Sequence, residues 1–320
     1  VKEKSGLSRG SRHDESSRLH VLRLNGRFTA YRSLELFDPL RLNTVSERIQ
    51  LRRLAAEADV IWVGYPAWFS VVRGMRGKKL VYDKMDDNAR LTRNGLLRRL
   101  ILRDEPKLIR RADCVFVTAR RFYEEIRPVH PNTVLLPNAV DSGFPAPEER
   151  PHDPRKRIFG YVGTIGHWFD FAAVEAILKA DEKNRVVLAG PVEQKGPKHP
   201  RLSYLGTVPH ERVPELIRTF DVCLYPFLRN ELLDTIDPVK IYEYLAMNKP
   251  VLAVRSPETE KFGGLVTLYE SSGNVGKISD RDLPAPFQNV EQREAFFLKS
   301  DWQARAAVIE QKLGETQHGT

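Results

Sequence analysis

The chain has little cysteine and no long apolar run. Its 320 residues include only two cysteines, which excludes a disulfide framework and a zinc site built from cysteine. The longest apolar runs, such as Asp59–Gly64 and Asp113–Ala119, have the length of a strand and cannot cross a bilayer. The first eighteen residues are charged and no apolar stretch follows them, unlike a secretory signal peptide. We therefore expect a cytoplasmic protein.

The composition is that of an ordinary globular protein with two domains. Hydrophobic residues make up 41% and charged residues 29% of the chain, which excludes collagen-like and disordered classes. At roughly 100–200 residues per domain, the length favours two domains that each bury a core.

Positive charge is concentrated in the first half of the chain. The net charge is +9, with 29 basic and 19 acidic residues in 1–150 but 22 and 23 in 151–320. The densest part is Arg90–Arg121, where ten basic residues stand against three acidic ones. Such unequal halves indicate two domains with different partners.

Short apolar runs alternate with longer amphipathic ones along most of the chain. We expect strands at Leu19–Leu24, Asp59–Gly64, Lys79–Asp83, Asp113–Thr118, Thr133–Leu136, Ile158–Val162, Arg185–Ala189, Ser203–Leu205, Asp221–Tyr225 and Pro250–Val254. We expect helices at Val45–Ala58, Asn94–Arg110, Ala119–Arg127, Phe171–Ala180, Glu211–Phe220, Pro238–Met247 and Val290–Leu313, the last with a break near Lys299–Asp301. This order predicts an α/β fold with doubly wound parallel sheets.

A proline-rich, charged segment divides the two halves. Residues 143–157 have the composition of a linker, so we expect an N-terminal domain over 1–142 and a second domain over 158–300. A helix and polar tail would follow over 301–320. Ligands of such folds bind at the carboxyl ends of the strands.

The first motif with chemical meaning is Gly160-x-x-Gly163-x-x-Gly166, which follows an expected strand and precedes a helix. Glycines there allow the backbone to approach a phosphate, and the helix end supplies amides. The spacing matches neither the dinucleotide fingerprint nor a P-loop. A tight turn with Asp170 as helix cap explains it equally well.

The second motif lies at the start of the helix predicted over Pro238–Met247. Asp237 reads as its N-cap, with Pro238 at the first helical position. Lys240 in the first turn suits an anionic ligand, and Glu243 could accept hydrogen bonds from the vicinal hydroxyls of a ribose. A surface ion pair between residues three apart is the commoner use of this spacing.

Three carboxylates, Asp83, Asp86 and Asp87, follow the strand predicted over Lys79–Asp83. One of them could act as general base toward a hydroxyl nucleophile. Capping of a loop or helix explains them too, and three carboxylates could hold a metal, although nothing else in the chain supplies a further ligand set.

Taken in order, the motifs resemble nucleotide-sugar glycosyltransferases of the GT-B fold, and in particular bacterial enzymes of the teichuronic acid and exopolysaccharide type. The stretches that carry the resemblance are Val60–Pro66, Leu80–Asp87, Val134–Asp141, Ile158–Phe171, Tyr204–Val208, Asp221–Phe227, Asp237–Ala253 and the region of Trp302. They cover most of the chain from about residue 59 onward.

The resemblance implies a donor site in the second domain. A loop of Gly163, Thr164, Gly166 and His167 would face the diphosphate, with Lys240 neutralising it and Glu243 holding the ribose. The segment Tyr225, Pro226 and Phe227 would line the nucleotide pocket. Asp86 is the best match for the acceptor-side base, with Asp83 and Asp87 close behind. The resemblance implies no metal or other cofactor.

Two features depart from the resemblance. Many retaining members carry a glutamate eight positions before the one matched by Glu243, where this chain has Thr235, so retention or inversion is not assigned. The first plausible strand begins only at Leu19, so the first β-α unit of the N-terminal domain is expected to be absent, either because the chain is truncated or because that sheet is small.

The leading hypothesis is therefore transfer of a sugar from a nucleotide diphosphate to a lipid-linked or polysaccharide acceptor in cell-surface glycan synthesis. An epimerase of the same fold and a non-catalytic scaffold are the alternatives. Leucines between the arginines of Arg90–Arg121 are typical of a helix on an anionic membrane, and equally of a core-facing helix with a basic outer side. The segment has almost no aromatic residues for stacking bases, which argues against nucleic acid.

Overall fold

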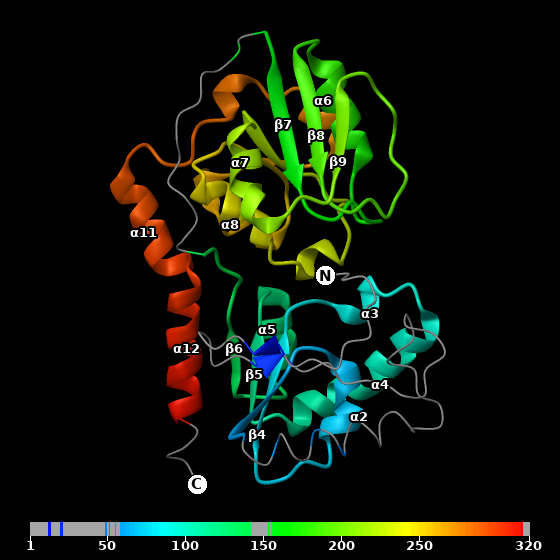
Figure 1. Cartoon of the computed structure of the whole chain (residues 1–320), viewed down its shortest axis with the longest axis vertical. Coiled ribbons are helices and arrows are strands. Elements are labelled where there is room, and N and C mark those ends of the chain that lie inside the picture. The colour runs from blue at the N-terminus through cyan, green and yellow to red at the C-terminus, as the bar shows by residue number, and fades with distance from the viewer. Residues whose placement is uncertain are drawn as a thin grey trace. The chain divides into compact units, whose positions relative to one another are not determined.

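The structure is a computed structural model of the 320-residue chain (Figure 1). It describes residues 58–141, 153 and 155–315, together with the single positions 12, 13, 20, 21, 49, 51 and 55. Contacts divide the chain into two compact units, Val1–Asp83 with Thr92–Cys114, and Lys84–Leu91 with Val115–Thr320.

The second unit contains a six-stranded parallel sheet in the order β12-β11-β10-β7-β8-β9. Its strands are β7 (Arg157–Val162), β8 (Asn184–Ala189), β9 (Leu202–Gly206), β10 (Val222–Tyr225), β11 (Val251–Val254) and β12 (Thr267–Tyr269). This is the doubly wound order, in which the direction of winding reverses between β7 and β10. In such sheets ligands bind at the carboxyl ends of these two strands, which are therefore the expected ligand position.

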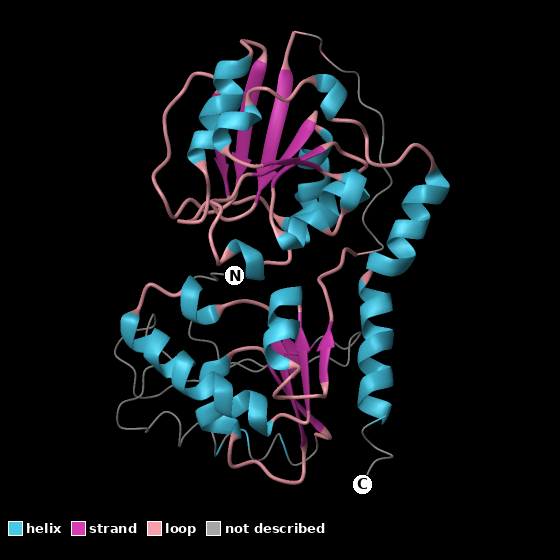
Figure 2. Cartoon of the chain, turned by 180° about the vertical axis from the view of Figure 1, so that it is seen from behind, coloured by secondary structure: helices cyan, strands magenta, loops and turns pink. Residues whose placement is uncertain are grey.

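Helices pack against this sheet to form its core (Figures 1 and 2). Helix α6 (Phe171–Ala180) packs on β8, α7 (Val213–Arg218) on β7, and α8 (Val239–Ala246) on β10 and β11. The remaining elements are the short helices η3 (His210–Arg212), η4 (Leu233–Thr235), α9 (Pro257–Glu260), η5 (Gly263–Leu265), α10 (Ser272–Val275) and η6 (Asp280–Asp282), and the helices α11 (Val290–Ser300) and α12 (Trp302–Glu315).

A four-stranded sheet has the order β3-β4-β5-β6. Its strands are β3 (Val60–Val63), β4 (Lys79–Lys84), β5 (Cys114–Val117) and β6 (Thr133–Leu135), and the pairs β3–β4 and β5–β6 are parallel. The helices of this part of the chain are η2 (Pro66–Trp68), α2 (Phe69–Val72), α3 (Asn88–Leu91), α4 (Gly95–Arg111) and α5 (Arg120–Ile126). Two short strands, β1 (Arg12–His13) and β2 (His20–Val21), pair antiparallel.

The sequence-based assignment of fold class is confirmed. The α/β architecture with parallel sheets is present, and the strands expected from Asp59 onward occur within two residues of the predicted ends. Strand β12 was not predicted, because its three residues are too short for a periodic pattern. The described residues include little of three predicted features: the strand at Leu19–Leu24, the helix at Val45–Ala58 and the linker. The expected absence of a first β-α unit also concerns residues outside the described ones.

Among the helices that the structure describes, none combines the length and apolar character needed to cross a lipid bilayer.

Close backbone contact between the ends of β7 and β8 makes one glycine essential. Gly190 has a φ of 140°, and a Cβ atom there would overlap the carbonyl oxygen of Gly163. We predict that Gly190→Ala lowers the free energy of unfolding by about 2 kcal/mol or more, through backbone strain and overlap. Urea titration measures this loss.

The control is Gly264→Ala, because a Cβ atom at Gly264 meets nothing within 4 Å. This variant should unfold within about 0.5 kcal/mol of the original chain. Equal midpoints for the two variants would contradict the account of how β7 and β8 meet.

Candidate functional site

The glycine loop leaves the end of β7 beside the segment that follows β8. The N–H of Gly163 donates to Ala189 O at 2.8 Å, and that of Ile165 to Pro191 O at 2.8 Å. Thr164 and His167 are half-buried, Gly166 is buried, and the imidazole of His167 packs edge-on against Trp168.

Helix α6 begins directly after this loop and is capped by a carboxylate. Asp170 Oδ1 accepts hydrogen bonds from the amides of Ala172 at 2.9 Å and Ala173 at 3.3 Å. The cap satisfies two amides of the first turn and adds a negative charge there. The glycines therefore lead into a helix end that already holds an anion.

The segment after β10 lies against the segment after the glycine loop. The N–H of Asp170 donates to Pro226 O at 2.8 Å, and the N–H of Leu228 to Trp168 O at 2.7 Å. The rings of Tyr225 and Phe227 are buried, and their centroids lie 4.1 Å apart. Burial raises the pKa of Tyr225 well above its ordinary value, so its hydroxyl is neutral. The predicted residues Tyr225, Pro226 and Phe227 thus lie at the reversal of the sheet.

Lys240 and Glu243 lie together near the start of α8. Lys240 Nζ contacts both carboxylate oxygens of Glu243, at 2.9 and 2.8 Å. The Glu243 side chain is 9% exposed and that of Lys240 is 24% exposed. The ion pair that the spacing allows is therefore formed, and it places a cation and a carboxylate side by side in the first turns of the helix.

Helix α8 is also joined directly to β7. The buried Tyr244 hydroxyl accepts a hydrogen bond from the Val162 N–H at 2.9 Å, one residue before Gly163. The face of α8 that carries Ile241, Tyr244 and Leu245 is completely buried. These contacts fix the helix that carries Lys240 against the strand that precedes the glycine loop.

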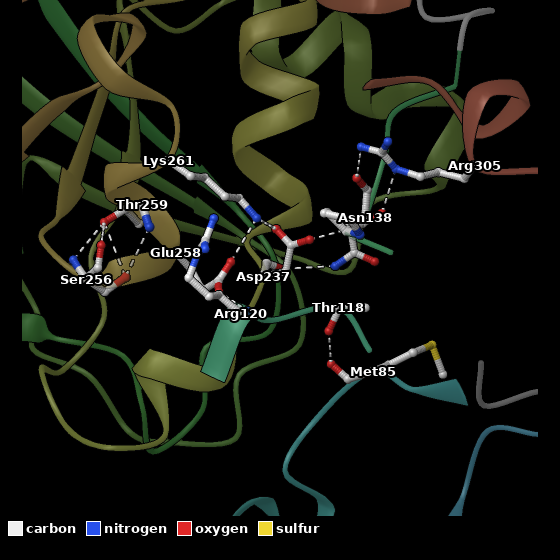
Figure 3. Close-up of polar contacts among 11 residues, drawn as sticks. Met85, Thr118, Arg120, Asn138, Asp237, Ser256, Glu258, Thr259, Lys261 and Arg305 are labelled. Carbon is white, nitrogen blue, oxygen red and sulfur yellow. Dashed lines mark hydrogen bonds and ion pairs between the residues drawn. The ribbon is translucent and has the colours of Figure 1, made fainter. Parts of the chain in front are cut away.

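Asp237 does not cap α8, which corrects the expectation from the sequence. The N-cap position is Pro238, and no side chain caps the helix. The Asp237 carboxylate is instead buried, where it accepts a hydrogen bond from the N–H of Asn138 and pairs with Lys261 (Figure 3). Partners distant in sequence thus outcompete the local capping geometry.

The three predicted aspartates have different surroundings. Trp62 Nε1 donates a hydrogen bond to Asp83 at 3.1 Å, and burial raises the pKa of Asp83 although this bond opposes the rise. Asp87 accepts from the Arg90 N–H at 3.0 Å and pairs with Arg90 Nε at 2.9 Å. Its carbonyl accepts from Leu91, so Asp87 holds the start of α3.

Asp86 differs from Asp83 and Asp87 in the contacts of its carboxylate. Within the part of the chain that the structure describes, no donor hydrogen-bonds to its carboxylate. Burial raises its pKa, Lys84 opposes the rise and Asp87 adds to it. A half-buried carboxylate that has a raised pKa and no hydrogen-bond donor among the described residues is suited to accepting a proton.

Sequence reasoning missed Glu258, which is buried, and its partner Lys261, which is partly exposed. Glu258 is 2% exposed, and Lys261 Nζ lies 2.9 Å from its carboxylate. The spacing of three residues was the only local signal, and it is usual for surface pairs. Within the described residues, no group of three or more His, Cys, Asp and Glu side chains is arranged to hold a metal ion.

Comparison with known proteins agrees with this geometry. No protein-family model matches the sequence. The chain is 21% identical over 263 residues to TuaH of Bacillus subtilis (strain 168), which is assigned to teichuronic acid biosynthesis as a glycosyltransferase. The match covers 74% of this chain and 64% of TuaH, so the chain spans somewhat less than two thirds of that relative's length.

Solved structures share the fold at low sequence identity. Sucrose-phosphate synthase from Thermosynechococcus elongatus superposes with a TM-score of 0.70 at 15% identity, covering 94% of this chain and 84% of that one. HepE of Anabaena, solved with UDP-glucose, gives a TM-score of 0.64 at 15% identity, with 84% and 82% covered. The chain therefore has the GT-B fold, and its resemblance to bacterial cell-surface glycosyltransferases is confirmed.

Proposed function

We propose that the protein transfers a sugar from a nucleotide diphosphate sugar to a lipid-linked or polysaccharide acceptor in bacterial cell-surface glycan synthesis. The observation that carries the proposal is the pair of Lys240 and Glu243 in the first turns of α8. The preceding strand, β10, borders the reversal of a doubly wound sheet. Ligands of such sheets bind at this position.

The donor would bind through charge at one end of α8. The positive end of the helix and the Lys240 ammonium together attract a diphosphate. Glu243, once Lys240 turns to the phosphates, can accept hydrogen bonds from the two ribose hydroxyls. The backbone amides of the glycine loop would add hydrogen bonds to the phosphates. We assign donor binding to residues 158–300.

The acceptor hydroxyl would be activated by Asp86. As its oxygen attacks the anomeric carbon, the bond from that carbon to the diphosphate breaks, and a glycosidic bond forms. The proton of the hydroxyl passes to Asp86, and the nucleoside diphosphate leaves with the electron pair. Lys240 would stabilise the charge that develops on it. We propose that this lysine takes the place of a divalent metal ion and that no cofactor is required.

A lipid-linked acceptor would bring the protein to a membrane, and α4 supplies a suitable surface. Ile101 and Leu108 of this helix are buried, whereas Leu96 is 43% and Leu102 is 55% exposed. The exposed leucines stand among the exposed basic residues Arg98, Arg99, Arg103, Lys107 and Arg110. We propose that this face binds the anionic inner surface of the cell membrane.

Removal of Lys240 tests the donor site. Titration calorimetry with a panel of nucleoside diphosphates should identify one that binds, and Lys240→Ala should weaken it about tenfold or more because a cation contacting phosphate is lost. The double variant Lys240→Ala/Glu243→Ala removes the buried carboxylate that the single change leaves unpaired.

Lys179→Ala is the matched control, since Lys179 forms an exposed ion pair on α6. It should bind the nucleotide as the original chain does. Unchanged affinity in both Lys240 variants would overturn the assignment of the donor site.

Substitution of Asp86 tests the catalytic base. Asp86→Asn should lower kcat by about 100-fold or more while leaving nucleotide affinity unchanged. The base must be ionised, and burial raises the pKa of Asp86. As the pH is lowered, kcat should therefore begin to fall at a higher pH than it would with an aspartate of ordinary pKa. Release of nucleoside diphosphate measures the rate.

Asp87→Asn is the control, because Asp87 is held by Arg90; it should retain most of the activity. Donor consumed equally well without acceptor would indicate an epimerase instead. Full activity in Asp86→Asn would refute its role as base.

Flotation with vesicles tests the membrane surface. The protein should float with vesicles rich in anionic lipid and remain at the bottom of the gradient with neutral ones, because arginines provide much of the attraction. The variant Leu96→Gln/Leu102→Gln should bind weakly, whereas Val129→Gln, at an apolar side chain that is 69% exposed elsewhere, should bind normally. Binding to neither vesicle type would refute the proposal.

A further inference from the structure

A network of charged side chains within the second compact unit centres on Lys261 (Figure 3). Its ammonium contacts Asp237 Oδ1 at 2.5 Å and Glu258 Oε2 at 2.9 Å. The side chains of Asp237 and Glu258 are 0% and 3% exposed, and the side chain of Lys261 is 28% exposed. One partly exposed cation therefore neutralises two buried anions.

Each of these carboxylates also accepts a hydrogen bond from a backbone amide in a different segment. Asp237 accepts from the Asn138 N–H, and Glu258 accepts from the Arg120 N–H at 2.7 Å. Asn138 Nδ2 donates to the Asp237 carbonyl at 2.9 Å. The network thus joins the segments that follow β5 and β6 to the residue that precedes Pro238 and α8.

The segment held by Glu258 also supports the loop that carries Asp86. Two residues before Arg120, Thr118 donates from its N–H to Lys84 O at 3.3 Å and from Oγ1 to Met85 O at 2.6 Å (Figure 3). The backbone next to Asp86 is therefore fixed by the same turn that Glu258 contacts. A continuous set of contacts runs from the proposed base to the start of α8.

The remaining contacts stiffen the same network. Arg305 of α12 donates to Pro137 O at 2.8 Å and to Asn138 O at 3.3 Å, on the other side of the segment that Asp237 holds (Figure 3).

Burial acts to lower the pKa of Lys261, but Asp237, Tyr242 and Glu258 together raise it above its usual value. The ammonium therefore stays charged across the range in which the protein would work.

We propose that Lys261 is a positioning residue, an inference that rests on the proposed function. It fixes the position of α8, which carries Lys240 and Glu243, relative to the loop that carries Asp86. It contacts neither Lys240 nor Glu243 among the interactions of the described residues. Without its charge, two buried carboxylates repel each other and release the amides of Asn138 and Arg120.

Hydrogen exchange tests this link without reference to activity. In Lys261→Met, amide exchange should become about tenfold faster or more in peptides covering 84–91 and 118–126, as well as in 237–246, because they are joined through the network. Lys261→Arg should restore most of the protection. If Lys261→Met does not fold, Glu258→Gln removes one charge at the same place and should show the same pattern. Faster exchange confined to 237–246 and 257–262 would overturn the proposal.

Kinetics separate positioning from simple loss of stability. Lys261→Met should lower kcat about tenfold or more well below its melting temperature, with the nucleoside diphosphate Kd changed less than about threefold. Glu260→Gln is the control, because Glu260 pairs with Arg255 on the exposed side of α9. An unchanged kcat in folded Lys261→Met would overturn the proposal. If the original chain neither binds nucleotide nor transfers sugar, the proposed function fails, and hydrogen exchange still decides the structural link.

Discussion

The reversal of winding between β7 and β10 is the constraint on which the rest of the site depends. The segments that follow these neighbouring parallel strands are hydrogen-bonded to each other, and ligands of doubly wound sheets bind at the carboxyl ends of the strands, beside the reversal. The glycine loop borders it after β7, and Tyr225–Phe227 borders it after β10. Two contacts hold the backbone in place at this edge of the six-stranded sheet: the close approach of Gly190 to Gly163, and the hydrogen bond from the Val162 N–H to the Tyr244 hydroxyl.

Charged side chains inside the second compact unit are distributed in a way that a stable core alone does not require. Buried ion pairs contribute little to stability, because desolvation offsets much of their attraction. Yet Lys240 with Glu243, and Lys261 with Asp237 and Glu258, lie within one region around α8. The first pair contains the groups that an anionic donor needs. The second fixes backbone segments on which that pair and Asp86 depend.

Much of the fold could be predicted because local signals were strong. Helix α6 has the predicted bounds, since Asp170 caps it and its apolar residues follow helical spacing. The burial of Glu258 and its pairing with Lys261 could not be predicted, because charged residues are usually exposed and the other partners of this network lie far away in sequence. Asp237 was misassigned for the same reason: Asp-Pro is typical of a helix start, but Lys261 lies 24 positions later. In α4, periodicity alone did not reveal that Ile101 faces the core while Leu102 faces solvent.

A crystal structure with a bound nucleoside diphosphate would show directly whether Lys240 and Glu243 hold the donor. We expect phosphate oxygens within about 3.2 Å of Lys240 Nζ, ribose hydroxyls hydrogen-bonded to the Glu243 carboxylate, and an opened Lys240–Glu243 pair. A diphosphate bound elsewhere, with the 2.8 Å contact between Lys240 and Glu243 still closed, would contradict this expectation.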